Sequence, residues 1–159
     1  MSGPSFPILS TDALRAEGVD PPWTFGIADT VRFSELDVLN HANNAAYIGW
    51  LENARIAYFV HYGISDYVSE DRPTLVVRGL QIDFHAPLLL GERYVVTARS
   101  VEYGRTSWKM AHAICRDGVV CADALCTIVT VGGDPSRPVP LPQSTIEAIA
   151  KRDGAQKRR

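Results

Sequence analysis

The pattern of hydrophobic and polar positions along the chain predicts one long helix and five strands. Residues 44–61 carry an apolar run at helical spacing, which Gly63 can terminate. Asn43 or Asn44 can cap this helix, because a side-chain oxygen there accepts a hydrogen bond from an unpaired backbone N–H. The hydrophobic positions leave little of the helix surface for water: Ala45, Ile48, Leu51, Ile56 and Phe59. Such a helix has to be covered nearly all round.

The strands are expected on both sides of this helix along the sequence. Alternating apolar and polar residues predict strands within residues 23–33, 74–87, 92–102, 106–116 and 119–131. Two short helices are expected at residues 11–17 and 143–151. The four strands that follow the long helix are consecutive and can therefore pair antiparallel. We expect an α+β fold in which one curved antiparallel sheet wraps around a central helix.

Length and composition favour a single globular domain. The chain has 159 residues, enough for one ordinary domain and too few for two. We expect an N-terminal extension at residues 1–22, the domain itself at 23–132, and a linker, short helix and solvated basic tail at 133–159. A net charge of −2 gives no strong electrostatic footprint for nucleic acid or a membrane surface.

The cysteines and the N-terminal segment indicate an intracellular protein. Cys115, Cys121 and Cys126 are too few for a disulfide framework and form no CxxC motif, so we interpret them as small apolar strand residues in a reducing compartment. No basic segment followed by an apolar run marks a secretory signal, and no apolar stretch reaches the roughly 18 residues of a membrane span. We therefore expect a cytoplasmic location.

Side chains suited to catalysis gather immediately before the long helix. This cluster contains Glu35, Asp37, Asn40, His41, Asn43 and Asn44. Taken alone, an acid in a loop before a helix is more often a turn or capping residue than a catalytic one. The spacing of the cluster changes that interpretation.

The cluster and the first turns of the helix resemble the signature of hotdog-fold acyl-CoA thioesterases, in the 4-hydroxybenzoyl-CoA thioesterase-like superfamily. The matching residues are Asp37, the sequence HANN at 41–44, Tyr47, Glu52 and Arg55. The sequences LDV and YIGWLE are also similar to plant-type acyl-carrier-protein thioesterases. The likeness extends over about residues 25–132 and implies a single hotdog domain.

Two positions depart from the family pattern. One thioesterase branch has a histidine seven positions after the acid, where this chain has Asn44. The plant-type enzymes have an asparagine two positions after the acid, where this chain has Leu39, with Asn40 next to it. The acid at Asp37 therefore matches the family, and the identity of the groups that assist it stays open.

The resemblance implies hydrolysis of acyl thioesters of coenzyme A, or of a carrier protein. Asp37 would act as general base on water or as nucleophile, and a backbone amide near Asn44 would donate to the oxyanion. His41 would orient water, bind Asp37 or donate to the carbonyl. No cofactor is expected, since coenzyme A enters as part of the substrate. Family members usually form homodimers or homotetramers.

Further residues are candidates for substrate binding, and each also has a structural interpretation. Asn43 caps the helix and can line the site, and Tyr47 is either a core residue or a border of the acyl group. An aromatic or a medium aliphatic acyl group would suit Tyr47, Trp50, Tyr58 and Phe59. Pantetheine or coenzyme A phosphates could contact Arg105, Thr106 and Ser107, which fit an ordinary hairpin equally well.

Two charged pairs are expected to be structural. Glu52 and Arg55 lie three positions apart on the helix and predict an ion pair on its surface with a structural role. Asp83 and His85 share one face of their strand, and this favours a solvent-facing or subunit-facing surface over a second catalytic pair.

Two other functions remain possible from the sequence. Hydratases and dehydratases on the same fold pair an acid and a histidine five positions apart in an Asp-x-Asn-Pro-x-His pattern, whereas Asp37 and His41 are four apart with no proline between them. A non-catalytic acyl-CoA binding protein is the other alternative. The sequence has no GxSxG, GxGxxG or Walker motif, and its histidines show no metal-ligand spacing.

Overall fold

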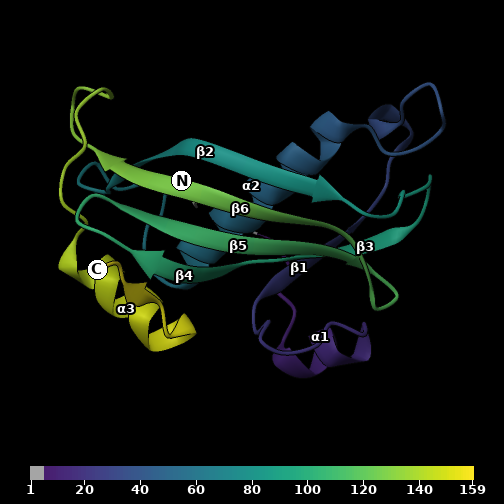
Figure 1. Cartoon of the computed structure of the whole chain (residues 1–159), viewed down its shortest axis with the longest axis horizontal. Helices are drawn as coiled ribbons and strands as arrows, with labels where there is room; N and C mark the ends of the chain where they lie inside the picture. The colour runs from purple at the N-terminus through teal and green to yellow at the C-terminus, as the bar shows by residue number, and fades with distance from the viewer. Residues whose placement is uncertain (1–5) are drawn as a thin grey trace.

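A single sheet packs against one long helix, α2 (Asn44–His61), in the computed structural model, which describes residues 6–159 (Figure 1). The strands are β1 (Gly26–Thr30), β2 (Thr74–Phe84), β3 (Arg93–Thr97), β4 (Arg99–Tyr103), β5 (Ser107–Arg116), β6 (Val119–Val131) and β7 (Gln156–Lys157). The remaining elements are α1 (Thr11–Ala16), the 3-10 turn η1 (Phe33–Glu35) and α3 (Gln143–Asp153). The expected α+β fold is confirmed.

The strand order is β2–β6–β5, after which β3 and β4 both pair with β5. β1 continues the sheet beside β3, and β7 continues it beside β4. The predicted strand over 92–102 is interrupted at Ala98. The Thr97 side chain explains this break, because its Oγ1 donates to Ala113 O at 3.1 Å and accepts from Ala113 N at 2.8 Å. A side chain thus replaces the backbone ladder at that point.

The sheet covers one side of α2 and leaves the other open. Toward the sheet, α2 buries large side chains, among them Tyr47, Trp50, Leu51 and Tyr58. On the opposite side Ala45 and Glu52 are exposed and Ile48 is 47% exposed. The expectation that α2 is enclosed all round is therefore wrong for a single chain, because one sheet layer can cover only one side. No helix within residues 6–159 is long and apolar enough to cross a bilayer.

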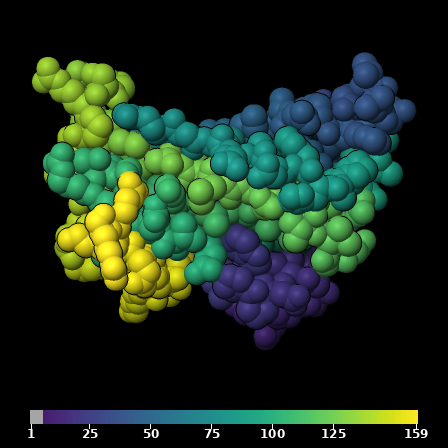
Figure 2. Space-filling model, viewed as in Figure 1, coloured from purple at the N-terminus to yellow at the C-terminus, as the bar shows by residue number. Residues whose placement is uncertain are grey.

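The C-terminal segment is part of the sheet, so the expected fraying tail is wrong. Asp153, the last residue of α3, accepts hydrogen bonds on Oδ2 from the Tyr58 hydroxyl at 2.5 Å and from Ser100 N at 2.6 Å. Burial raises the pKa of this carboxyl group. β7 then pairs in parallel with β4. In Figure 2 the first described residues and the C-terminal segment form two separate bulges on the same side of the molecule.

The cysteines behave as the sequence indicates. Cys115, Cys121 and Cys126 are buried, free thiols. Burial raises the pKa of Cys115 to about 11, so this thiol stays protonated near neutral pH.

Asn43, one of the two residues expected to cap the long helix, caps α2. Its Oδ1 accepts a hydrogen bond from Ala46 N at 2.8 Å, whereas Asn44 is the first residue of the helix. Both the start at Asn44 and the end at His61 agree with the sequence prediction. Gly63 follows the helix with a φ of +69°, a left-handed conformation that glycine adopts without strain.

Replacing Asn43 by alanine should destabilise the protein, since the helix loses its cap. We expect Asn43→Ala to lower the free energy of unfolding by about 0.5–2 kcal/mol in urea denaturation. The matched control is Asn44→Ala, because the Asn44 side chain makes no hydrogen bond within residues 6–159. Equal effects of the two substitutions would contradict the assignment of the cap.

Removing the Tyr58 hydroxyl should also destabilise the protein, because this group joins α2 to α3 through Asp153 and to β4 through Ser100. We expect Tyr58→Phe to lower the free energy of unfolding by about 1–3 kcal/mol. Tyr103→Phe serves as control, since the Tyr103 hydroxyl has no hydrogen bond in the described part of the chain. If Tyr58→Phe and Tyr103→Phe have the same free energy of unfolding, the contact with Asp153 does not stabilise the protein.

Candidate active site

An open groove lies at the amino end of α2. It has a volume of about 460 Å³ and is lined by Asp37, Leu39, His41, Ala42, Asn44, Tyr47, Phe84, His85, Ala86 and Pro87. These residues come from the loop before α2, the first turn of the helix, and the end of β2. The groove brings together four of the residues singled out in the sequence: Asp37, His41, Asn44 and Tyr47.

The loop that carries Asp37 is closed by its own hydrogen bonds. Asp37 Oδ1 accepts from Leu39 N at 2.8 Å and from His41 N at 3.2 Å, while Asp37 N donates to His41 O at 2.8 Å. Asn40 completes the turn with a φ of +58°, a conformation that asparagine tolerates better than most residues. The second carboxylate oxygen, Oδ2, has no hydrogen bond within residues 6–159 and remains available to a ligand or water.

Glu35 and Asn43 fix this loop against α2. Glu35 O accepts hydrogen bonds from both Asn43 N, at 2.7 Å, and Asn43 Nδ2, at 2.8 Å. The Glu35 carboxylate accepts from Trp50 Nε1 at 2.9 Å, further along the helix. On the other side, Ala42 N donates to Leu88 O at 2.8 Å. Backbone and side-chain contacts therefore hold Asp37 at a set position relative to the helix start.

The amino end of α2 supplies an unpaired donor to the groove. The Asn44 amide has no acceptor among residues 6–159, because Asn43 caps Ala46 rather than Asn44. Unpaired N–H groups and the helix dipole together favour negative charge at this position. A residue with a free carboxylate oxygen and a residue with an unpaired backbone amide thus line the same groove, and acyl transfer uses groups of these two kinds.

Tyr47 forms an apolar wall of the groove. The residue is 2% exposed, and its ring meets Phe84 edge to face, with ring centroids 5.1 Å apart. Burial raises the pKa of the Tyr47 hydroxyl, so it stays protonated and can only be a neutral hydrogen-bonding group near pH 7. Tyr47 is therefore a core residue that also lines the groove.

His85 also lines the groove, at the exposed strand face for which the sequence predicted a solvent-facing or subunit-facing surface. Its Nε2 lies 2.6 Å from Asp123 Oδ2 on β6. β2 ends at Phe84, and the His85 amide donates to Cys121 O. Asp123 is the sheet partner of Asp83, so this contact places His85 on the same face as Asp83, as the sequence alternation predicts.

The predicted coenzyme A contacts at 105–107 do not reach the groove of the same chain. Ser107 pairs with Val129 on β6, whereas Phe84 pairs with Ala122. The two positions on β6 are seven residues apart (129 − 122), which corresponds to about 23 Å along a strand. Within one chain, Arg105, Thr106 and Ser107 belong to the opposite end of the sheet.

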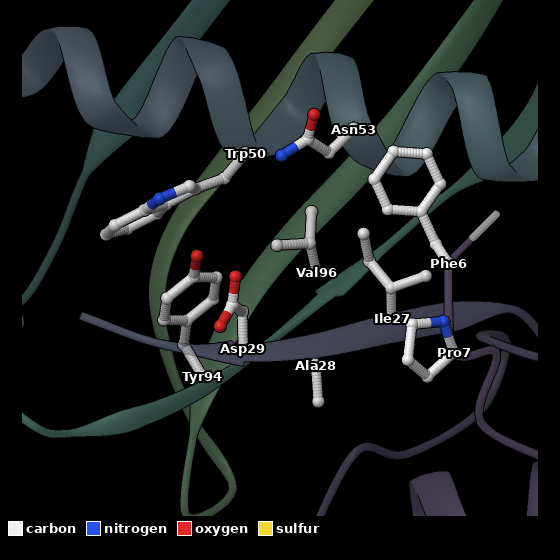
Figure 3. A pocket seen from close by; sticks show the side chains of 9 residues that line it. All are labelled: Phe6, Pro7, Ile27, Ala28, Asp29, Trp50, Asn53, Tyr94 and Val96. Atoms are coloured by element: carbon white, nitrogen blue, oxygen red, sulfur yellow. The ribbon is translucent and has the colours of Figure 1, made fainter. Parts of the chain in front are cut away.

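A second cavity of about 190 Å³ lies between α2 and strands β1 and β3 (Figure 3). Trp50 and Tyr94 stack at one end, with ring centroids 4.0 Å apart, and Phe6 lies at the other end. The Tyr47 and Trp50 rings, 4.8 Å apart, stand between this cavity and the groove. Of the four aromatic residues suggested for the acyl group, only Tyr47 lines the groove; Tyr58 is wholly buried and Phe59 lies elsewhere in the core.

The described residues contain no group of three or more His, Cys, Asp or Glu side chains arranged to hold a metal ion.

A family model described as the thioesterase-like superfamily matches residues 31–149. Long-chain acyl-CoA thioesterase FadM of Escherichia coli is 29% identical over 103 residues, covering 64% of this chain and 78% of FadM. Protein THEM6 of Danio rerio is 27% identical over 124 residues, covering 77% of this chain and 58% of that protein.

Solved structures show the same fold. A thioesterase superfamily protein from Jannaschia sp. CCS1 superposes with a TM-score of 0.86 at 32% identity, over 96% of this chain and 98% of that one. A thioesterase from Thermus thermophilus, complexed with coenzyme A and Zn, superposes with a TM-score of 0.71 at 36% identity, over 81% of this chain and 94% of that one. The family match includes the Asp37 loop, α2 and most of the sheet. This chain is therefore a single hotdog domain that belongs to the thioesterase-like superfamily.

Proposed function

We propose that this protein hydrolyses acyl-CoA thioesters in the groove at the amino end of α2. The observation that carries the proposal is that the free oxygen of Asp37 and the unpaired Asn44 amide belong to one groove. Family membership supports thioester hydrolysis in general. Coenzyme A is favoured over a carrier protein because FadM is named an acyl-CoA thioesterase and the Thermus thioesterase was solved with coenzyme A.

In the proposed mechanism the thioester carbonyl oxygen binds at the Asn44 amide, where its negative charge grows as the carbonyl carbon is attacked. Asp37 Oδ2 removes a proton from a water molecule that attacks this carbon, the C–S bond breaks, and the proton is passed to the leaving thiolate. Alternatively, Oδ2 attacks directly and forms an anhydride that water then hydrolyses. Both routes yield a free acid and coenzyme A, and neither needs a cofactor.

His41 is proposed to assist Asp37. Its backbone is held by Asp37, and its side chain lines the groove without a hydrogen bond inside residues 6–159. The imidazole is therefore free to orient the attacking water or to donate to the carbonyl oxygen. Asn43 acts indirectly in this proposal, since it holds the loop and the helix start together.

We further propose that a second copy of the chain completes the site. β2 pairs only with β6 within one chain, so its other edge has no strand beside it in the described residues. Apolar side chains are exposed along this edge and the open side of α2: Ile48, Val77 and Phe84. A homodimer, or a tetramer built from it, would cover these residues. Segment 105–107 of the second copy could then contact coenzyme A, which it cannot do within one chain.

Asp37→Asn tests the proposed base or nucleophile. We expect kcat for acyl-CoA hydrolysis to fall by about 100- to 10,000-fold, with KM within a few fold, because the substitution removes transition-state chemistry and keeps the shape of the groove. A panel of acyl-CoA substrates with a thiol-detecting dye provides the measurement. Asp83→Asn, an exposed carboxylate that does not line the groove, is the matched control. Near-normal turnover by Asp37→Asn would remove Asp37 from this role.

His41→Ala tests the assisting residue. We expect a smaller loss in kcat, about 10- to 1,000-fold, because His41 helps a reaction that Asp37 and the Asn44 amide still perform. His61→Ala, at the exposed far end of α2, should retain the wild-type rate in the same assay. A rate unchanged by His41→Ala would make His41 an ordinary loop residue.

A further inference from the structure

Arg55 is a buried cation without a partner in the described chain. The residue is 5% exposed, and Nη1 has no hydrogen-bond acceptor within residues 6–159. The ion pair with Glu52 expected from the sequence does not form, and none of the ion pairs among these residues includes Arg55. A guanidinium withdrawn from water is costly unless an acceptor satisfies it. Among residues 6–159, Nη1 of Arg55 is therefore available to an acceptor.

Arg55 lines a cavity that is separate from the groove. The cavity has a volume of about 140 Å³ and lies between the middle of α2, β2 and Tyr67. Its remaining walls are mainly apolar: Ile56, Phe59, Leu75, Val76, Val77 and Ile128. None of its lining residues lines the groove at Asp37. A small, partly open cavity with one buried cation and several apolar side chains in its wall is suited to a ligand with an anionic end and an apolar body.

The charges around the cavity also favour an anion. Glu52 is the one carboxylate in the lining, and its side chain lies at the exposed face of α2. Burial raises the pKa of Tyr67, while the positive charges of Arg55 and Arg72 lower it. The Tyr67 hydroxyl thus stays protonated and can act as a second donor. Among the lining residues one cation, Arg55, therefore faces one carboxylate, Glu52. Arg55 is buried and Glu52 is exposed, so water screens the carboxylate more than the guanidinium inside the cavity.

We propose that this cavity binds a small organic carboxylate, with its carboxylate group on the Arg55 guanidinium and its body against the apolar wall. Arginine matches carboxylate geometry with two parallel hydrogen bonds, which makes this pairing strong when it is shielded from water. Cavities of about 150 Å³ accommodate benzene, so a ring-sized acid such as benzoate fits the available volume. Carboxylic acids are also the products of thioester hydrolysis, so the cavity could bind the product acid. This role as a product site rests on the proposed function, whereas the carboxylate site itself does not.

The test is calorimetric titration of the intact protein with benzoate and with benzamide, which has the same size and no charge. We expect wild-type protein to bind benzoate at least about tenfold more tightly, because hydrogen bonds to charged groups are the stronger ones. Arg55→Met, which keeps the side-chain volume, should abolish this preference, and Arg55→Lys should retain part of it. Equal affinity of the wild type for the two compounds would overturn the proposal without any variant being made.

Asp37→Asn separates this site from the groove. The variant should bind benzoate as the wild type does, even though hydrolysis is expected to fail. Loss of benzoate binding in Asp37→Asn would place the acid in the groove and overturn the proposal. If Asp37→Asn instead keeps both turnover and benzoate binding, the proposed function fails while the carboxylate site stands.

The melting temperature of the free protein provides a second readout. If Arg55 is unpaired until a carboxylate binds, Arg55→Met should melt at a higher temperature than the wild type in the absence of ligand, since a buried charge is removed. Benzoate should raise the melting temperature of the wild type only. An Arg55→Met variant that melts lower and no longer forms the wild-type oligomer would show that a second copy of the chain supplies the acceptor, which contradicts the proposal.

Discussion

The candidate site depends on the double hydrogen bond from Asn43 to the carbonyl oxygen of Glu35. Through it, one residue both caps α2 and anchors the loop that carries Asp37. The Glu35 side chain reinforces this attachment by accepting from Trp50, whose ring is buried against Tyr94. The carboxylate of Asp37 and the first amide of α2 are thereby held together by the core of the protein. Such a preorganised arrangement needs no movement when charge develops on a bound carbonyl.

The single chain leaves this arrangement open on one side. The groove is open, one face of α2 is exposed at Ala45 and Ile48, and β2 has a free edge among the described residues. A catalytic site that uses a carboxylate and a backbone amide gains strength when water is excluded. The proposed second copy would supply that cover, so dimer formation and catalysis are connected in this account by the same exposed residues.

The sequence predicted the elements whose ends carry a local signal. The bounds of α2 follow from the asparagine cap and Gly63, and the strands follow from their alternation. The break at Ala98 was not predictable, because it depends on a Thr97 hydroxyl that reaches Ala113 on a neighbouring strand. Likewise, the C-terminal segment is held in place by the partly buried carboxylate of Asp153, and the basic composition of the segment gave no indication of this contact.

The residues of the candidate site likewise fall into those that the sequence predicted and those that it did not. Asp37, His41, Asn44 and Tyr47 lie close together along the chain, so a local sequence motif is enough to single them out. His85 joins them because β2 ends beside the groove. Arg55 was expected to pair with Glu52, and it is instead a buried cation beside β2 and Tyr67. Contacts between elements far apart in the chain determine the surroundings of both residues, and no local sequence pattern predicts such contacts.

The most direct test of the central claim is a crystal structure of the Asp37→Asn variant with an intact acyl-CoA thioester bound. We expect the thioester carbonyl oxygen to lie about 2.7–3.1 Å from the Asn44 backbone nitrogen, with the side chain at position 37 facing the carbonyl carbon. A thioester bound away from the amino end of α2, for example in the cavity beside Trp50 and Tyr94, would contradict it.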